Sequence, residues 1–252
     1  MDAMDDNAGR HNQDLEHSVA RLHKGRTYED LTTVMVVPTR GDIPAKVVGS
    51  WMSLMRPMNQ VCAGPEFFAG FEVGDAYNRA VEGILATNVQ IRVNKGRPFR
   101  YMLTLEDDNL PPPDGILRLM ESIKEHDVVG GLYWTKGEEG QPMIYGNPSV
   151  LPRNFVPQPP LPQQVQRCNG LGMGFTLFRV DLLEKMAPDL PKNDQGVRQW
   201  FKTVQEWSPD KGGKAFTQDL WFFDQAAKYG ARVASDNRVL VGHYDKVNDV
   251  VW

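Results

Sequence analysis

Residues 101–109 constrain the fold most strongly, because an apolar run leads there directly into three acids. Tyr101–Leu105 has the length and composition of a buried strand, although periodicity alone does not exclude a helical segment. Glu106, Asp107 and Asp108 would then lie at the carboxyl end of that strand, where open α/β sheets bind ligands. Adjacent carboxylates repel one another, and a divalent cation compensates their charge. The alternative is a solvated acidic turn before the prolines that follow.

The composition is that of a globular protein. The chain has 252 residues, enough for one large domain or two small ones, and 41% of them are apolar, enough for a core. A net charge of −4 argues against a surface that coats nucleic acid, although a local basic groove stays open. No uninterrupted apolar run reaches the length of a membrane span, so none is expected.

The sequence favours a cytoplasmic protein. The N-terminus is acidic and lacks the basic and apolar regions of a signal peptide. Cys62 and Cys168 are far apart and show no metal-ligand spacing, which favours reduced thiols over a disulfide. Residues 1–30 are polar with a weak helical pattern, which predicts an arm or a short docking helix, and residues 31–252 predict a single domain.

Strands and helices are predicted to alternate in the first half of that domain. The predicted strands are Val34–Val37, Val61–Ala63, Tyr101–Leu105 and Asp127–Trp134, and the predicted helices are Ala45–Met55, Gly74–Ala86 and Asp114–Lys124. Asp114 is expected to cap the last of these helices, and Met143–Tyr145 to return as a hairpin. This alternation predicts an α/β domain with mainly parallel strands.

The second half of the domain is more mixed. Residues 148–164 contain six prolines, which predicts an irregular surface loop rather than a packed element. Asp181–Met186 predicts a short helix, and a helix from Thr217 to Tyr229 is ended by Gly230. Short strands are expected at 232–234 and 239–243.

Two features of this half suggest ligand contact, and each has a simpler alternative. Asn169–Gly174 carries three alternating glycines, which would let the backbone approach a ligand, but the spacing is not that of a dinucleotide fingerprint. Trp200, Phe201 and Trp207 lie in the polar segment 188–214, where they would either stack on sugar rings or pack in the core.

The order of these motifs resembles that of GT-A fold glycosyltransferases, close to the family 2-like nucleotide-sugar enzymes. Val36–Arg40 resembles the first strand with its nucleobase loop, and Leu105–Asp108 resembles the metal-binding DxD region. Asn169–Leu183 resembles the glycine-rich segment ahead of the catalytic helix, and Thr217–Gly230 resembles that helix. His243 stands where many members have a final metal-binding histidine.

The resemblance covers about residues 33–245 and implies a GT-A fold. That fold is a mainly parallel central sheet flanked by helices, with a small hairpin and irregular acceptor-side loops. The chain departs from the family pattern at two positions. Glu106 replaces the first acid of the DxD region, and Gln218 replaces the first acid of the pair at the catalytic helix, so that only Asp219 remains there.

The resemblance implies metal-dependent transfer of a sugar from a nucleotide-diphosphate sugar to an acceptor hydroxyl. Asp108 and His243 are then the expected ligands of Mn²⁺ or Mg²⁺. Asp219 is the candidate general base, which would make the reaction inverting. The alternative for His243 is an ordinary core or surface residue. The alternative for Asp219 is an acid that stabilises the N-terminus of a helix.

A further set of residues is expected to contact the donor nucleotide, a UDP- or GDP-sugar: Pro38, Thr39, Arg40, Asp75, Arg79, Glu106, Asp107 and Gly172. Thr39 and Arg40 are placed at the nucleobase by the resemblance alone. Arg79 suits bidentate phosphate contacts, with a surface salt bridge as its alternative. The acceptor stays open, and the acidic balance disfavours a nucleic acid.

Two other functions remain compatible with these motifs. A metal-dependent sugar nucleotidyltransferase shares the sheet and the metal, but usually shows a glycine-rich, basic loop after the first strand, which Pro38–Gly41 does not offer convincingly. A non-catalytic module that binds nucleotide sugars would keep the fold without the chemistry.

Overall fold

The computed structural model describes residues 30–58, 60–208 and 212–252. The expected N-terminal arm lies almost entirely outside these residues. Contacts divide the chain into two compact units, residues 1–30 and residues 31–252, and the second unit contains the described elements. Cys62 and Cys168 are free thiols. No helix among the described residues combines the length and apolar character needed to cross a bilayer.

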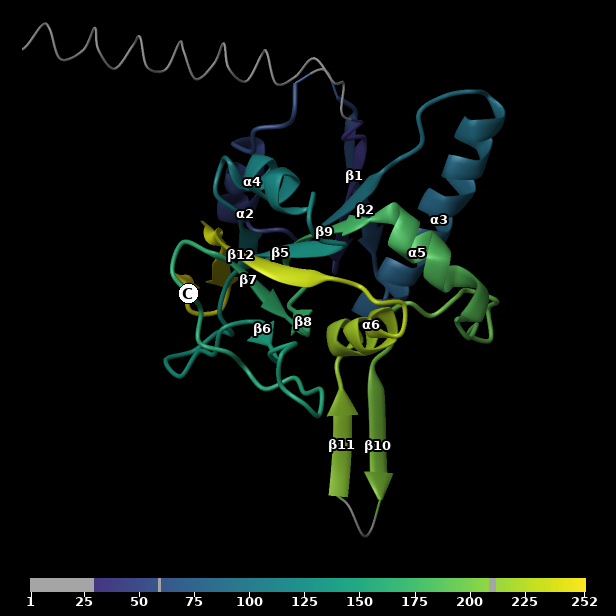
Figure 1. Cartoon of the computed structure of the whole chain (residues 1–252). Coiled ribbons are helices and arrows are strands. Elements are labelled where there is room, and N and C mark those ends of the chain that lie inside the picture. Colours follow the sequence, from purple (N-terminus) through teal and green to yellow (C-terminus); the bar gives the residue numbers. More distant parts are fainter. Residues whose placement is uncertain (1–29, 59, 209–211) are drawn as a thin grey trace, which may run out of the picture. The chain divides into compact units, whose positions relative to one another are not determined.

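A seven-stranded sheet forms the centre of this unit (Figure 1). Its strands are, in spatial order, β2 (Cys62–Ala69), β1 (Thr33–Thr39), β3 (Tyr101–Leu105), β9 (Phe175–Arg179), β5 (Val128–Leu132), β12 (Val233–Leu240) and β7 (Val165–Cys168). Only β9 and β7 run antiparallel to their neighbours in this sheet. The predicted α/β architecture with mainly parallel strands is therefore confirmed.

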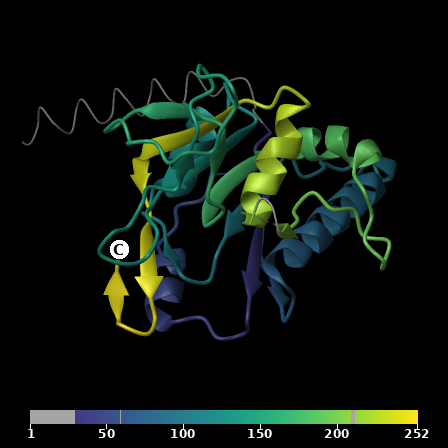
Figure 2. The ribbon, with the colours of Figure 1, turned by 90° about the horizontal axis from the view of Figure 1, so that it is seen from below.

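Helices cover both faces of the sheet (Figure 2). The first face carries α3 (Val73–Val93), α5 (Val180–Met186), continued by a 3₁₀ turn (Ala187–Asp189), and α6 (Gln218–Ala227), and the second carries α2 (Ala45–Met52) and α4 (Gly115–Ser122). Along β1, Val34 and Val36 pack on the first face, whereas Met35 and Val37 pack on the second. Burial on both sides explains why β1 is a continuous apolar run.

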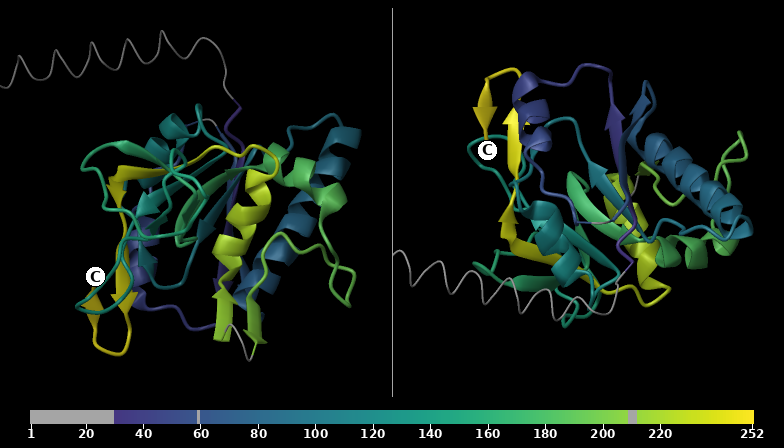
Figure 3. Two further views of the ribbon diagram at one scale, coloured as in Figure 1. Left: turned by 60° about the horizontal axis from the view of Figure 1, so that its bottom comes forward. Right: turned by 90° about the horizontal axis from the view of Figure 1, so that it is seen from above.

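Short strands form smaller sheets around this centre. β4 (Asn109–Leu110) and β14 (Val250–Val251) flank β13 (Gly242–Asp245), and β6 (Ile144–Tyr145) pairs with β8 (Gly170–Leu171). Figure 3 shows β13 and β14 on the side of the unit away from α3. A further hairpin, β10 (Val204–Ser208) with β11 (Gly212–Phe216), extends away from the sheet beside α6 (Figure 1).

One sequence-based expectation about local structure is wrong, and two others are resolved. Asp114 precedes α4, but its side chain makes no cap hydrogen bond, because it pairs instead with Arg118 one turn later at 2.5 Å. The predicted return is present: Trp134 bridges Pro142 in antiparallel orientation, and the Met143 N–H donates to the Tyr133 carbonyl at 2.9 Å before Ile144 pairs with β8. Of the two alternatives for Trp200 and Phe201, core packing is the one observed, since they are 0% and 1% exposed.

Candidate functional site

The carboxyl ends of the parallel strands β1, β3 and β5 meet at one edge of the sheet, and the candidate site lies there. Thr39 ends β1, the acids 106–108 follow β3, and Lys136 lies in the turn after β5. β13 then brings His243 to this edge, because His243 pairs with Asn109 of β4 and the Tyr244 N–H donates to the Asp108 carbonyl at 2.7 Å.

Asp107 is turned toward β1. Its Oδ2 accepts a 2.7 Å hydrogen bond from the Thr39 hydroxyl and a longer one, 3.4 Å, from the Arg40 N–H. Pro38 is buried within β1, beside Phe68 of β2. The structure therefore brings Thr39 and Arg40 together with one acid of the motif, at the end of the strand that contains Pro38.

Asp108 points the other way, and its Oδ2 has two partners. Lys136 Nζ lies 2.5 Å from this oxygen, and His243 Nε2 lies 3.4 Å from it. Burial alone would raise the pKa of Asp108, but the hydrogen bonds and charges of His243 and Lys136 outweigh burial and hold the pKa below its ordinary value. Asp108 is thus a carboxylate anion at neutral pH.

The tautomer of His243 follows from its other ring nitrogen. Nδ1 lies 2.7 Å from the Trp134 carbonyl oxygen, which can only accept, so Nδ1 carries a proton. The doubly protonated ring donates from Nε2 to Asp108, whereas in the neutral ring Nε2 presents a lone pair toward Asp108. Two acceptors that face each other need a proton or a cation between them. The ring packs edge-on against Tyr133, and the His243 backbone exchanges two 3.0 Å hydrogen bonds with Trp252.

This donor set fits a divalent cation that is shared with a ligand. A carboxylate and an imidazole nitrogen suit Mn²⁺ and Mg²⁺. Within the part of the chain that is described, no group of three or more histidine, cysteine or acidic side chains is arranged to hold an ion alone. Mg²⁺ commonly binds through one or two carboxylates plus phosphate oxygens and waters, and Asp108 supplies such a carboxylate.

Glu106 lies near both Asp108 and Asp219. The buried Tyr77 hydroxyl on α3 donates to Glu106 Oε1 at 2.9 Å. Removal from water is the largest cause that raises the pKa of Glu106, and the charges of Asp108 and Asp219 raise it further, to about 8. Glu106 therefore binds a proton more readily than an ordinary carboxyl does.

Asp219 occupies the first turn of α6 and is only 7% exposed. Its Oδ1 accepts from the Thr217 hydroxyl and, at 2.8 Å, from the Leu220 N–H. Burial raises the pKa of Asp219, because these hydrogen bonds compensate only part of the lost hydration. Burial is the larger cause that raises the pKa of Tyr145 to about 12, and the charge of Asp219 adds to it. The Asp219 carboxylate therefore lies near the Tyr145 phenol.

The glycines of 169–174 are required by protein packing. A Cβ on Gly172 would lie 2.1 Å from the Tyr133 hydroxyl, and one on Gly174 would lie 2.2 Å from Asn109 Oδ1. A Cβ on Gly170 would meet Phe155 and Phe223. The expected close approach is therefore present, and the Tyr133 side chain makes it at Gly172.

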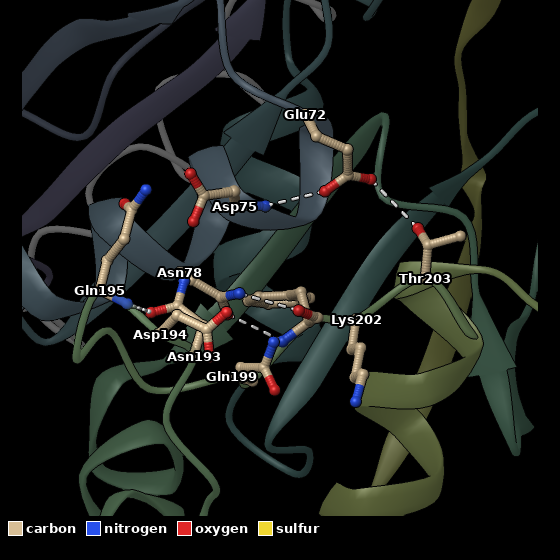
Figure 4. Close-up of a pocket in the computed structure, with 10 residues that line it drawn as sticks. Glu72, Asp75, Asn78, Asn193, Asp194, Gln195, Gln199, Lys202 and Thr203 are labelled. Carbon is tan, nitrogen blue, oxygen red and sulfur yellow. Dashed lines mark hydrogen bonds between the residues drawn. The ribbon is translucent and has the colours of Figure 1, made fainter. Parts of the chain in front are cut away.

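Asp75 and Arg79 belong to a different place on the molecule. Arg79 Nε pairs with Asp75 Oδ2 at 2.8 Å, and the guanidinium lies over Phe71. Asp75 lines an open polar cavity of ≈ 430 Å³ that is formed by the start of α3 and residues 193–203 (Figure 4). The salt bridge expected as the alternative for Arg79 is present, and this cavity shares no lining residue with the Asp108 pair.

Sequence reasoning missed Tyr77 and Lys136. Tyr77 has a sequence signal, because it falls on the apolar stripe of α3 with Ala80, Val81 and Ile84, and a tyrosine facing the core needs a partner for its hydroxyl. Lys136 has no such signal, since it lies in a polar turn whose contact with Asp108 arises only when β3 and β5 are placed in one sheet.

No protein-family model and no curated protein matches this sequence. Among solved structures, A197 from STIV has a TM-score of 0.54 at 14% identity, covering 87% of this chain and 92% of that one. GalNAc-T7 with UDP, GalNAc and Mn²⁺ has a TM-score of 0.47 at 14% identity, and the match covers 86% of this chain and 44% of that one. S. aureus TarS 1-349 in complex with UDP-GlcNAc has a TM-score of 0.42 at 12% identity, and the match covers 83% of this chain and 58% of that one. Such low identities concern the fold alone, and the predicted GT-A fold is confirmed.

Proposed function

We propose that this chain is a metal-dependent glycosyltransferase that moves a sugar from a UDP- or GDP-sugar to an acceptor hydroxyl. One observation carries this proposal. Asp108, which pairs with His243, and the buried Asp219 both lie close enough to Glu106 for their charges to raise its pKa, at the edge of the sheet where α/β folds bind ligands. A carboxylate and imidazole that could hold a cation, near a second carboxylate of raised pKa, are the parts that donor activation and acceptor deprotonation require.

The donor side is formed by β1, β3 and β13. Thr39, Arg40 and Asp107 form the nucleotide-binding loop, and Glu106 faces a ribose hydroxyl. Asp108 and His243 would hold Mn²⁺ or Mg²⁺. The cation would neutralise negative charge on the departing diphosphate.

The acceptor side is formed by the start of α6. Asp219 accepts the proton of the acceptor hydroxyl while the hydroxyl oxygen bonds to the anomeric carbon. The bond from that carbon to the phosphate oxygen breaks, and its electron pair leaves with the nucleoside diphosphate. A single displacement inverts the anomeric configuration. A raised pKa suits Asp219 to this role, because a base works best when its pKa approaches the working pH.

A thermal-shift screen of UDP, GDP and their sugars, with Mn²⁺ or with chelator, tests the donor and the cation together. A ligand at 100 times its dissociation constant stabilises the fold by about 2.7 kcal/mol. We expect a shift with nucleotide only when the cation is present. Equal shifts in chelator would contradict the cation bridge, and no shift with any nucleotide would contradict the donor.

Product analysis separates the proposed reaction from the two alternatives. A nucleoside triphosphate with a sugar phosphate would yield pyrophosphate if the chain were a nucleotidyltransferase, and we expect none. Nucleotide-sugar binding without hydrolysis at any cation concentration would indicate a binding module instead.

A further inference from the structure

We infer that Lys136 neutralises Asp108 in the cation-free protein and moves to the donor's diphosphate when a divalent cation takes its place. This inference rests on the proposed function, because it concerns the cation and the donor of the same site. It adds a residue that the family resemblance did not indicate. It also makes the cation and the ammonium alternative partners of one carboxylate oxygen.

The geometry carries the first half of this inference. Lys136 Nζ, at 2.5 Å, and His243 Nε2, at 3.4 Å, both approach Oδ2 of Asp108. A cation held by Asp108 and His243 would therefore bind where the ammonium now lies. Like charges a few ångströms apart repel strongly at the edge of a protein, so the ammonium must leave when the cation arrives.

Lys136 can leave without disturbing its neighbours. Its side chain is 34% exposed, on a flexible four-carbon stem. The turn that carries it is closed by a 2.9 Å hydrogen bond from the Thr135 N–H to the Gln141 carbonyl. Trp134 keeps its own bond to His243 whether or not the ammonium moves. The lysine head is thus the movable part of an otherwise fixed cluster.

Charge and chemistry indicate where the ammonium goes. Departure of a nucleoside diphosphate adds one negative charge at this edge, next to Asp107 and Asp108. An ammonium offers three donors and no acceptor, which suits phosphate oxygens. A displaced Lys136 therefore supplies positive charge where the leaving group gains negative charge, in addition to the charge of the cation.

Three variants test the inference. Lys136→Met removes the charge and keeps much of the stem, and Lys136→Arg keeps the charge. Lys185→Met is the matched control, because α5 begins where β9 pairs with the start of β3, at the opposite edge of the sheet. Melting temperatures in cation-free buffer establish that each variant folds.

The first measurement is Mn²⁺ binding without nucleotide, followed by the loss of the free-ion electron paramagnetic resonance signal. We expect Lys136→Met to bind Mn²⁺ roughly 5-fold more tightly, the factor that corresponds to the upper end for a partly exposed ion pair. Lys136→Arg and Lys185→Met should stay near wild type. Equal Mn²⁺ affinity in Lys136→Met and wild type would overturn the competition between ammonium and cation.

The second measurement is calorimetric binding of UDP and of GDP to Mn²⁺-saturated protein. Here Lys136→Met should bind the nucleotide on the order of 10-fold more weakly, as for the loss of one hydrogen bond to a charged group. The variant thus gains affinity for the cation and loses affinity for the nucleotide, and a residue with a merely structural role would not change the two in opposite directions. Unchanged nucleotide affinity would overturn the phosphate contact.

Failure of the proposed function gives a different pattern. If wild type binds Mn²⁺ but neither nucleotide, the donor assignment and the phosphate contact are both contradicted, while the Mn²⁺ measurement still tests whether the Lys136 ammonium and the cation compete for Asp108. If neither wild type nor Lys136→Met binds Mn²⁺, both the cation site and this competition are contradicted.

Discussion

Thr39 donates a 2.7 Å hydrogen bond to Asp107, and this bond joins the carboxyl ends of β1 and β3. The next acid, Asp108, turns to the opposite side and contacts Lys136 and His243. Both acids lie in the turn between β3 and β4, which the Asn109 N–H closes on the Glu106 carbonyl at 3.1 Å, and this turn directs the two side chains to different partners. Neighbouring carboxylates therefore belong to different halves of the candidate site.

Asp108→Ala should abolish Mn²⁺ binding, whereas Asp107→Ala should weaken it much less. Asp108 is the carboxylate that faces His243, while Asp107 is occupied by Thr39 and the Arg40 N–H. A titration of each variant with Mn²⁺ gives the comparison. If Asp107→Ala proved the more damaging change, the assignment of the two acids would be reversed.

Asp219→Asn should separate binding from chemistry. Asparagine keeps the shape of the side chain and can still accept from Leu220 N–H, but it cannot take up a proton as a carboxylate does. We expect transfer to fall by roughly 10²–10⁴-fold, as for the loss of a general base. Donor affinity should hardly change, since the interaction lost is one made in the transition state.

Single-turnover transfer beside equilibrium donor binding measures both quantities for Asp219→Asn. Because the pKa of Asp219 is raised, the wild-type rate should also decline on the acid side of that pKa as the base becomes protonated. Near wild-type turnover in the variant would remove Asp219 from the mechanism and indicate another base or a retaining reaction.

Gly172→Ala should destabilise the fold by about 1–3 kcal/mol, the usual cost of overpacking a buried site. The new Cβ would lie 2.1 Å from the Tyr133 hydroxyl and 2.7 Å from Met143 Cε. Gly83→Ala in α3 is the control, because a Cβ there meets nothing within 4 Å and a helical alanine is favoured over glycine. Urea denaturation of both variants measures the difference, and an equally stable Gly172→Ala would contradict the packing argument.

Asp236→Asn should destabilise the protein by about 1–3 kcal/mol at pH 7, with a smaller effect in acid. Burial opposes the charge of Asp236, but hydrogen bonds from Arg238 and Ser122 outweigh it, so the pKa lies below its ordinary value of 3.8. A lowered folded-state pKa contributes stability above the unfolded-state pKa, and that contribution is lost as pH falls through the folded-state value.

Denaturation of wild type and Asp236→Asn at neutral pH and below pH 3.8 measures this dependence. The difference in free energy of unfolding between the two proteins should become smaller on acidification. A difference that stays constant would show that Asp236 contributes shape rather than charge to the packing of β12 against α4.

The sequence predicts the central elements well where one physical signal dominates. β3 has the predicted bounds, because its apolar run ends at charged residues. α3 continues past the predicted end to Val93, since nothing in its sequence stops a helix there. β12 extends the strand expected at 232–234 to Leu240, because its polar centre is buried through Asp236, which pairs with Ser122 and Arg238, and the second strand, β13, begins only at Gly242.

The candidate site is predicted only in part for a related reason. Thr39, Asp107, Asp108 and His243 stand in the order of a known family, and the structure brings them to one sheet edge. Lys136 enters only through long-range strand placement, which local patterns do not encode. Arg79 has a suitable chemistry for phosphate, and in this structure it pairs with its helical neighbour Asp75.

Because β4 pairs with β13, Mn²⁺ binding at the proposed cation site would report how far folding has advanced. Asn109 and His243 are adjacent in this pairing, although more than half of the chain separates them. A contact of such long range closes a large loop, and it becomes favourable only after the intervening strands have found their places. During refolding, capture of Mn²⁺ should therefore lag behind the recovery of secondary structure, and a chain arrested before residue 243 should leave the ion in solution.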